Sequence, residues 1–238
     1  MKEVAQLALA VQLPDDETFE SFQSESHQGV LNQLQDFIAR ENADIGQPNS
    51  FYLFGIKGVG KSHLLHASCV YATELGKSSL CLSFSEIKQL SVEILDGLEQ
   101  IDLICLDDIQ LIANDSDWQR AVFDLFNRAI EHNKCLIITG DQSAAKLGIS
   151  LPDLVSRLTW GYTEQVKTLS DDDKIIALQY RAQQRGMALN NDVARYLLNR
   201  LSRDMASLIS SLDELDKASI REQRKITIPF IKDVLLNN

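Results

Sequence analysis

The chain has 238 residues, of which 45% are hydrophobic and 24% charged, and 34 acidic against 23 basic residues give a net charge of −11. This length can hold one large domain, or a large and a small one, with enough apolar content for a core. The acidic excess argues against strong direct binding of DNA by this chain, because contacts to phosphates need clustered Lys and Arg. It is compatible with a protein partner.

The N-terminal stretch is apolar, but it does not resemble a signal peptide. Glu3 lies in what would be the basic region, and Gln6 interrupts the short run from Val4 to Val11. No stretch approaches the length of a membrane span. We therefore expect a soluble, cytoplasmic protein without a membrane partner, beginning with a tail over residues 1–14.

Strand and helix patterns alternate in the part that follows a first helix around residues 30–38. Strands are expected at residues 51–54, 79–84, 103–106, 135–139 and 165–169, and helices at 63–75, 86–98 and 117–131. Such alternation predicts a parallel sheet covered by helices on both faces. The expected fold class is therefore α/β, with a five-stranded nucleotide-binding domain over residues 15–169.

Only helical patterns follow residue 169. Ser170 with Asp173 forms a capping pair, and further helices are expected to start at Asn190 or Asn191, at Asp204 and at Thr227. These elements predict a small all-helical domain over residues 170–238.

A complete G-x-x-x-x-G-K-S phosphate loop runs from Gly55 to Ser62, after a predicted strand and before a predicted helix. Glycines let successive backbone N–H groups converge on an anion at the helix N-terminus. Lys61 would reach the β- and γ-phosphates, and the Ser62 hydroxyl would ligate Mg²⁺. The residues expected to surround the phosphates are Gly55, Lys57, Gly58, Val59, Gly60, Lys61, Ser62 and His63. The alternative is an ordinary glycine-rich turn, which this full match in a strand–loop–helix context disfavours.

Paired carboxylates end a predicted buried strand downstream of the phosphate loop. Asp107 is expected to hold Mg²⁺ through water, and Asp108 to orient or polarise the attacking water. The alternative is that the two carboxylates only cap a following helix.

Two weaker signals come later in the chain. Thr139 or Asp141, at the end of another predicted strand, could sense the γ-phosphate or position the water. Arg157, just before the expected fifth strand, suggests an arginine supplied to a neighbour's nucleotide, where it would stabilise transition-state charge. A surface salt bridge is the alternative for Arg157, and the pattern alone favours it.

The remaining candidates have simpler interpretations. The four cysteines show no C-x-x-C spacing and are expected to be buried, reduced thiols. His63 and His66 are interpreted as packing or surface residues rather than metal ligands. Leu13, Phe19 and Phe22 could form the apolar pocket for the base, or they could belong to the core.

Together, these motifs resemble the AAA+ module of the DnaA family of bacterial replication initiators. The segments that carry the resemblance are the phosphate loop, L-D-D-I-Q at 106–110, I-I-T-G-D at 137–141 and S-R-L-x-W-G at 156–161. It extends from about residue 19 to the end of the sequence. Two features resemble the shorter Hda branch of the family. The sequence ends after the helical lid, and Gln6, Leu7, Leu9 and Val11 resemble the peptide that docks on the DNA polymerase sliding clamp.

The resemblance implies that Arg157 is an arginine finger acting in trans. Bound to the clamp on DNA, the protein would present Arg157 to ATP on DnaA, and hydrolysis would leave DnaA inactive and prevent re-initiation. Ala206 stands where related ATPases carry a second sensor arginine, and Arg203 is near but out of register. This departure implies weak hydrolysis by the chain itself, with ADP as the expected nucleotide, together with Mg²⁺.

Two alternatives stay open at this point. A self-assembling ATPase motor, such as a helicase loader, would use Asp107, Asp108 and Arg157 in neighbouring subunits of a homo-oligomer. A nucleotide-locked adaptor would give Arg157 no role at all. Outside the family context, the tail would be interpreted as disordered or packed in the core.

Overall fold

The computed structural model describes residues 17–22, 24–40, 48–201 and 204–236. The predicted clamp-binding residues Gln6, Leu7, Leu9 and Val11 lie outside these ranges. The same holds for Leu13, one of the candidates for the base pocket, and for Arg203.

The described residues form one five-stranded, all-parallel sheet, as predicted. Its strands are β1 Ser50–Phe54, β2 Ser79–Ser83, β3 Leu103–Asp107, β4 Cys135–Gly140 and β5 Tyr162–Gln165. The order across the sheet is β2-β3-β4-β1-β5. The three central strands β3, β4 and β1 are almost entirely buried, because helices cover both faces of the sheet.

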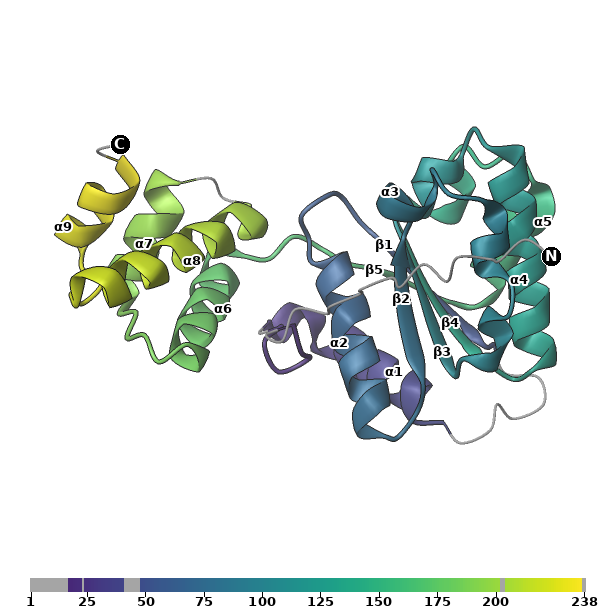
Figure 1. Ribbon diagram of the computed structural model, residues 1–238, viewed down its shortest axis with the longest axis horizontal. Coiled ribbons are helices and arrows are strands. Elements are labelled where there is room, and N and C mark those ends of the chain that lie inside the picture. The colour runs from purple at the N-terminus through teal and green to yellow at the C-terminus, as the bar shows by residue number, and fades with distance from the viewer. Residues whose placement is uncertain (1–16, 23, 41–47, 202–203, 237–238) are drawn as a thin grey trace, which may run out of the picture.

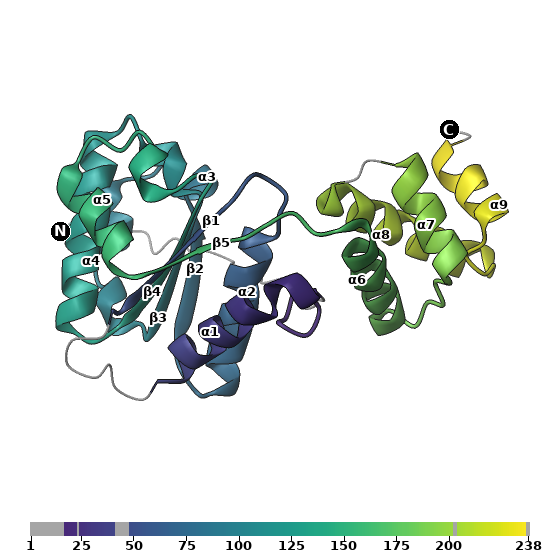
Figure 2. The ribbon, with the colours of Figure 1, turned by 180° about the vertical axis from the view of Figure 1, so that it is seen from behind.

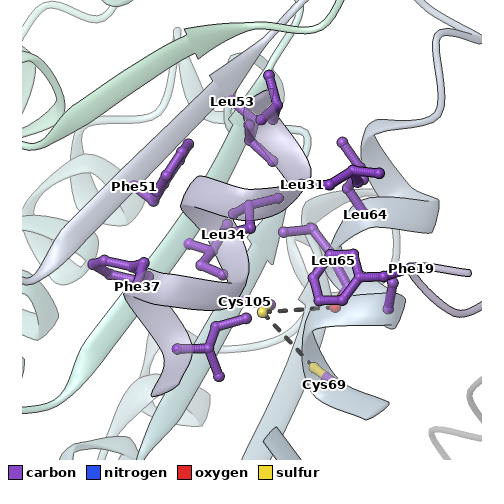
Figure 3. Close-up of a cluster of buried hydrophobic side chains, with 14 of the residues drawn as sticks. Phe19, Leu31, Leu34, Phe37, Phe51, Leu53, Leu64, Leu65, Cys69 and Cys105 are labelled. Carbon is purple, nitrogen blue, oxygen red and sulfur yellow. Dashed lines mark hydrogen bonds between the residues drawn. The ribbon is translucent and has the colours of Figure 1, made fainter. Parts of the chain in front are cut away.

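The helices form two layers around the sheet (Figures 1 and 2). Their bounds are α1 Gln28–Ala39, α2 Lys61–Glu74, α3 Phe84–Ile87, α4 Ser116–Glu131 and α5 Pro152–Trp160. One apolar core lies between the sheet and α1 and α2, and Figure 3 shows Leu34, Phe37 and Leu65 within it. A second core, which includes Val122 and Phe126 of α4, covers the opposite face.

The thiols of Cys69 and Cys105 lie in the first of these cores (Figure 3). The sulfur atoms are 3.7 Å apart, and Cys105 Sγ lies 3.9 Å from the carbonyl oxygen of Leu65. Cys81 is the strand partner of Cys105 across β2 and β3 and is also buried. All four cysteines are free thiols, as predicted.

A separate helical lid follows the sheet (Figure 1). It consists of α6 Asp171–Gln184, α7 Asn191–Arg200, α8 Met205–Glu222 and α9 Ile228–Ile231, which continues as a π-helical turn over Lys232–Leu236. Ser170 and Asp173 form the predicted capping box, and Asn190, Asp204 and Thr227 cap the later helices. The lid has its own core around Leu178, Leu212 and Phe230. None of the helices in the described ranges combines the length and apolar character that a membrane span requires.

Two predicted elements were wrong, and one helix was not predicted. The fifth strand is Tyr162–Gln165 rather than 165–169, because Gly161 packs against the Ser50 backbone and pairing with β1 starts directly after it. The expected helix at 86–98 is broken into α3 and two 3-10 turns. Gly97, with φ 79°, holds the left-handed conformation between the turns. Helix α5, which begins with Pro152 and buries Leu154 and Leu158, was not predicted.

Candidate nucleotide-binding site

The strand order brings three polar strand ends to one edge of the sheet. Strand β4 lies between β1 and β3. The phosphate loop follows β1, Asp107 ends β3, and Asp141 follows β4. In a parallel sheet the carboxyl ends of neighbouring strands meet, so the sheet alone gathers the motifs that lie far apart in the sequence.

The phosphate loop requires glycine at two positions. Gly58 and Gly60 have φ values of 85° and 96°, in the left-handed region. A Cβ on Gly58 would lie 2.7 Å from Asp204 Oδ1 of the lid, and one on Gly60 would lie 2.5 Å from the ring of Phe22. The lid and the segment before α1 therefore both approach the loop too closely for a side chain.

Lys61 begins helix α2 and is buried, with 7% of the residue exposed. Its ammonium group donates hydrogen bonds to the carbonyl oxygens of Gly55, at 2.8 Å, and Ile56, at 3.2 Å. Burial lowers the pKa of Lys61, and the nearby carboxylates of Asp108, Asp107 and Asp141 partly oppose this effect. Lys61 is thus a cation in a field of three carboxylates.

The predicted magnesium ligands lie side by side. Ser62 Oγ donates a hydrogen bond of 2.6 Å to Asp107 Oδ2, and the Thr139 hydroxyl donates to the other carboxylate oxygen. The described residues contain no group of three or more His, Cys, Asp or Glu side chains that could hold a metal ion by themselves. This donor set fits Mg²⁺, which usually takes one or two protein oxygens and completes its shell with water and substrate phosphates.

The other predicted catalytic carboxylates flank this pair. Asp108 has φ 63°, and its Oδ1 accepts a hydrogen bond of 2.8 Å from Gln110 Nε2. Its backbone N–H donates to Thr139 Oγ1 at 3.0 Å, so Thr139 ties the ends of β3 and β4 together. Asp141 Oδ1 is buried and accepts no hydrogen bond from the described residues, which leaves it available to a water or a ligand.

A cavity of about 500 Å³ opens beside the loop, within the usual range for a ligand of nucleotide size. The phosphate loop forms one wall, and the segment before α1 and the lid form the others. The lid and the segment before α1 contribute Glu17, Ser21, Phe22, Ala177, Arg181, Asp204, Met205, Ala206, Ile209, Ser210 and Asp213. Ala206 therefore lies at the cavity, as the resemblance implied. A larger hollow of about 1050 Å³ lies wholly within the lid and contains no part of the loop.

His63 and Arg181 meet in this cavity, although the sequence analysis did not single out Arg181. Arg181 Nη2 lies 3.1 Å from His63 Nδ1, and His63 Nε2 lies 2.9 Å from the Thr18 carbonyl oxygen. The available signal was a basic residue on the apolar side of α6, next to Leu178 and Ala182.

Arg157 lies elsewhere, on α5, and does not line the cavity. Its Nη2 donates a hydrogen bond of 2.9 Å to Asn127 Oδ1 of α4, and the guanidinium lies 6.0 Å from the centre of the Phe123 ring. These contacts orient the guanidinium, and no short-range sequence pattern indicated them.

Two family models match the chain. The bacterial DnaA ATPase domain matches residues 13–165, and the lid domain of Hda matches residues 171–235. Three solved structures share the fold. Domain III of the Thermotoga maritima replication initiation protein DnaA has a TM-score of 0.80 at 18% identity, over 95% of this chain and 98% of that one.

AMPPCP-bound DnaA from Aquifex aeolicus has a TM-score of 0.72 at 21% identity, over 89% of this chain and 69% of that one. The Thermotoga maritima RuvB Holliday junction branch migration motor has a TM-score of 0.68 at 13% identity, over 94% and 72%. At these identities the structures show a shared AAA+ fold. Since the DnaA model alone spans well over half of the sequence, the chain belongs to the family of the bacterial DnaA ATPase domain and carries an Hda-type lid.

Proposed function

We propose that the chain is a nucleotide-bound AAA+ regulator that links the DNA polymerase sliding clamp to DnaA and stimulates hydrolysis of the ATP bound to DnaA. One observation supports this function above the others: Arg157 is oriented by α4 but lies outside the cavity of its own chain. If an arginine in that place acts on a nucleotide, that nucleotide is held by another molecule. Its activity would convert DnaA to the ADP form and prevent re-initiation.

The nucleotide in the chain's own cavity would be ADP, held with Mg²⁺ by Lys61 and Ser62. Bound AMPPCP in the Aquifex aeolicus DnaA, which shares the fold, supports a nucleotide at this place. Ala206 supplies no charge to the cavity, and the Asp204 carboxylate closely approaches Gly58. A negative charge beside the loop disfavours the additional charge of a γ-phosphate.

The partner-binding part of the proposal rests on the tail. Gln6, Leu7, Leu9 and Val11 would bind the clamp as an extended peptide whose apolar side chains enter pockets. Anchoring on the clamp would raise the local concentration of Arg157 near DNA-bound DnaA. Replacing Gln6 and Leu9 by Ala should abolish capture by immobilised clamp while ADP binding persists. Unchanged capture would remove the tail from the proposal.

The central test measures hydrolysis of ATP on DnaA in the presence of DNA-loaded clamp. The wild-type chain should accelerate hydrolysis, and Arg157→Ala should not. If Arg157→Ala equals the wild type, the chain is a nucleotide-locked adaptor. If the purified chain hydrolyses ATP rapidly by itself and Arg157→Ala abolishes that turnover, the motor alternative is correct.

A further inference from the structure

Thr139 is a polar residue enclosed by the centre of the sheet. It lies in β4, between β1 and β3, where it pairs with Leu53, and none of its surface is exposed. Burying a hydroxyl group in apolar surroundings is costly unless hydrogen bonds compensate. The hydrogen bonds of Thr139 therefore indicate what this side chain does.

Two hydrogen bonds determine the direction of the Thr139 hydroxyl. The backbone N–H of Asp108 donates to Thr139 Oγ1 at 3.0 Å, so the hydroxyl oxygen is the acceptor there. A carboxylate can only accept, so the hydroxyl donates its single proton to Asp107 Oδ1. A phosphate would need a donor. The one donor of Thr139 is already bound to Asp107.

The two oxygens of the Asp107 carboxylate are thus held from opposite sides. Thr139 holds Oδ1 from within the sheet, and Ser62 donates to Oδ2 at 2.6 Å from the end of the phosphate loop. Because Ser62 gives its proton to Asp107, the lone pairs of its own oxygen remain for a metal ion. The last torsion of an aspartate side chain has only broad minima, so the hydrogen bond from Thr139 restrains a carboxylate that could otherwise rotate.

The end of β4 is a firm support for this contact. The Gly140 carbonyl oxygen accepts a hydrogen bond of 3.2 Å from the backbone N–H of Gly55, the first residue of the phosphate loop. A Cβ on Gly140 would collide with the Tyr52 hydroxyl, which donates to the Gln142 carbonyl oxygen at 2.6 Å. The position of Thr139 is therefore fixed relative to the loop that would hold the phosphates.

We propose that Thr139 is a positioning residue for Mg²⁺. It holds Asp107 Oδ1 so that Oδ2 stays directed at Ser62 and the metal, and it does not contact the nucleotide. This inference rests on the proposed site for ADP and Mg²⁺, and it names the residue that sets the metal affinity of that site. Hydrogen bonds to metal-binding side chains orient the ligands, and removing one typically lowers metal affinity 10- to 100-fold.

The test uses Mn²⁺, a paramagnetic substitute for Mg²⁺. Electron paramagnetic resonance gives its dissociation constant from the ADP-loaded protein, and calorimetry gives the affinity for ADP in EDTA. Thr139→Val removes the hydroxyl and should weaken Mn²⁺ about tenfold or more, while ADP affinity in EDTA stays within about twofold of the wild type. Thr139→Ser keeps the hydroxyl and should bind Mn²⁺ almost as the wild type does. The matched control, Thr163→Val at an exposed position of the edge strand β5, should change neither value.

Two outcomes for Thr139→Val would overturn the inference. Mn²⁺ affinity within twofold of the wild type would show that the hydroxyl does not position the metal ligand. An equal loss of ADP affinity in EDTA would indicate a general structural role. If Thr139→Val does not fold, Thr139→Ser decides, since a tenfold loss of Mn²⁺ with the hydroxyl present would show that the methyl group matters instead.

Ser62→Ala and Asp107→Asn separate this inference from the proposed site. If both variants lose Mn²⁺ but Thr139→Val does not, only the inference about Thr139 fails. A wild type that binds ADP without Mn²⁺ would overturn the metal site and the inference together. A wild type that does not bind ADP would overturn the nucleotide site as well.

Discussion

Arg181 and Arg157 each donate a hydrogen bond to a side chain of another helix, but they lie in different parts of the molecule. Arg181 is almost fully buried and donates to His63 in the cavity between the lid and the phosphate loop. Arg157 is half-buried on α5 and donates to Asn127 at a distance from that cavity. In each case the hydrogen bond fixes the position of the guanidinium.

In the proposed function, holding a nucleotide and promoting hydrolysis would therefore belong to separate surfaces of this molecule. The inward surface, which lines the cavity between the phosphate loop and the lid, would stay closed on one ligand. The outward surface, which carries Arg157, would meet the nucleotide of a partner. Variants that affect one surface and leave the other intact test this separation.

The largest expected effect concerns the outward arginine. Arg157→Ala should lower the stimulated hydrolysis of DnaA-bound ATP by about 10³-fold, the lower range for arginine fingers. Arg157→Lys should keep less than about a tenth of the activity, because lysine lacks the planar fork. Single-turnover hydrolysis with clamp and DNA gives both values. Arg120→Ala, on the exposed side of α4, is the matched control. ADP affinity should not change, and a parallel loss of ADP would contradict the separation.

Lys61→Ala tests the inward surface. The substitution removes the loop cation, so the melting temperature should no longer rise with ADP, whereas ADP at 100 times its dissociation constant stabilises the wild type by about 2.7 kcal/mol. Thermal unfolding with and without ADP measures this difference. Lys88→Ala, at an exposed position that does not line the cavity, should retain the response. A full ADP response in Lys61→Ala would contradict the assignment of the site.

Gln119 of α4 connects the turn after Asp108 with the start of α5, the helix that carries Arg157. Its buried side chain donates to the carbonyl oxygens of Ile112 and Ala113 and accepts from Ser150 and Leu151 at the start of α5. Gln119→Leu should cost about 1–3 kcal/mol in unfolding free energy, because buried polar groups lose their partners. Urea unfolding measures the cost, and Asp124→Ala, on the exposed side of α4, should change it little. Wild-type stability of Gln119→Leu would show that this connection is dispensable.

The smallest expected effect is a pH dependence of the ion pair that Glu17 and His66 form beside Arg181. The hydrogen bond with Glu17 raises the pKa of His66 above 6.5. The ion pair therefore stabilises the folded protein fully below pH 6.5, and this stabilisation is lost as the pH rises through the raised pKa. Burial is the largest single influence on Glu17 and opposes its ionisation, but the hydrogen bond with His66 and the nearby positive charges together outweigh burial and lower the pKa of Glu17 below 4.5. The contribution of Glu17 is therefore lost only as the pH falls through that lowered value.

Between pH 6 and pH 9 the wild type should therefore lose about 1–3 °C of melting temperature relative to His66→Gln, which has no charge to lose. Thermal unfolding across this range without nucleotide is the measurement. Identical pH profiles would show that the ion pair contributes nothing to stability.

Local sequence was sufficient for the parts of the site that lie on continuous segments. The phosphate loop follows the buried strand β1 and Asp107 ends the buried strand β3, so both positions can be read from their neighbours in the chain. The sequence did not predict the contacts between residues far apart in the chain. Arg157 meets Asn127 across 30 residues, and Arg181 meets His63 across 118. Both contacts depend on how helices pack in three dimensions, which a single sequence does not encode in any short pattern. The helix expected at 86–98 was also wrong: α3 ends at Ile87 and two 3-10 turns follow, with Gly97 in the left-handed conformation between them.

The buried thiols give this protein an internal reporter of opening. Cys105 is completely buried under α2, the helix whose first turn carries Lys61 and Ser62. A thiol-labelling reagent can reach Cys105 only when α2 separates from the sheet, so the labelling rate measures the free energy of that opening. Occupancy of the phosphate loop should slow the labelling in proportion to affinity, which would make nucleotide binding measurable from a site that no ligand touches.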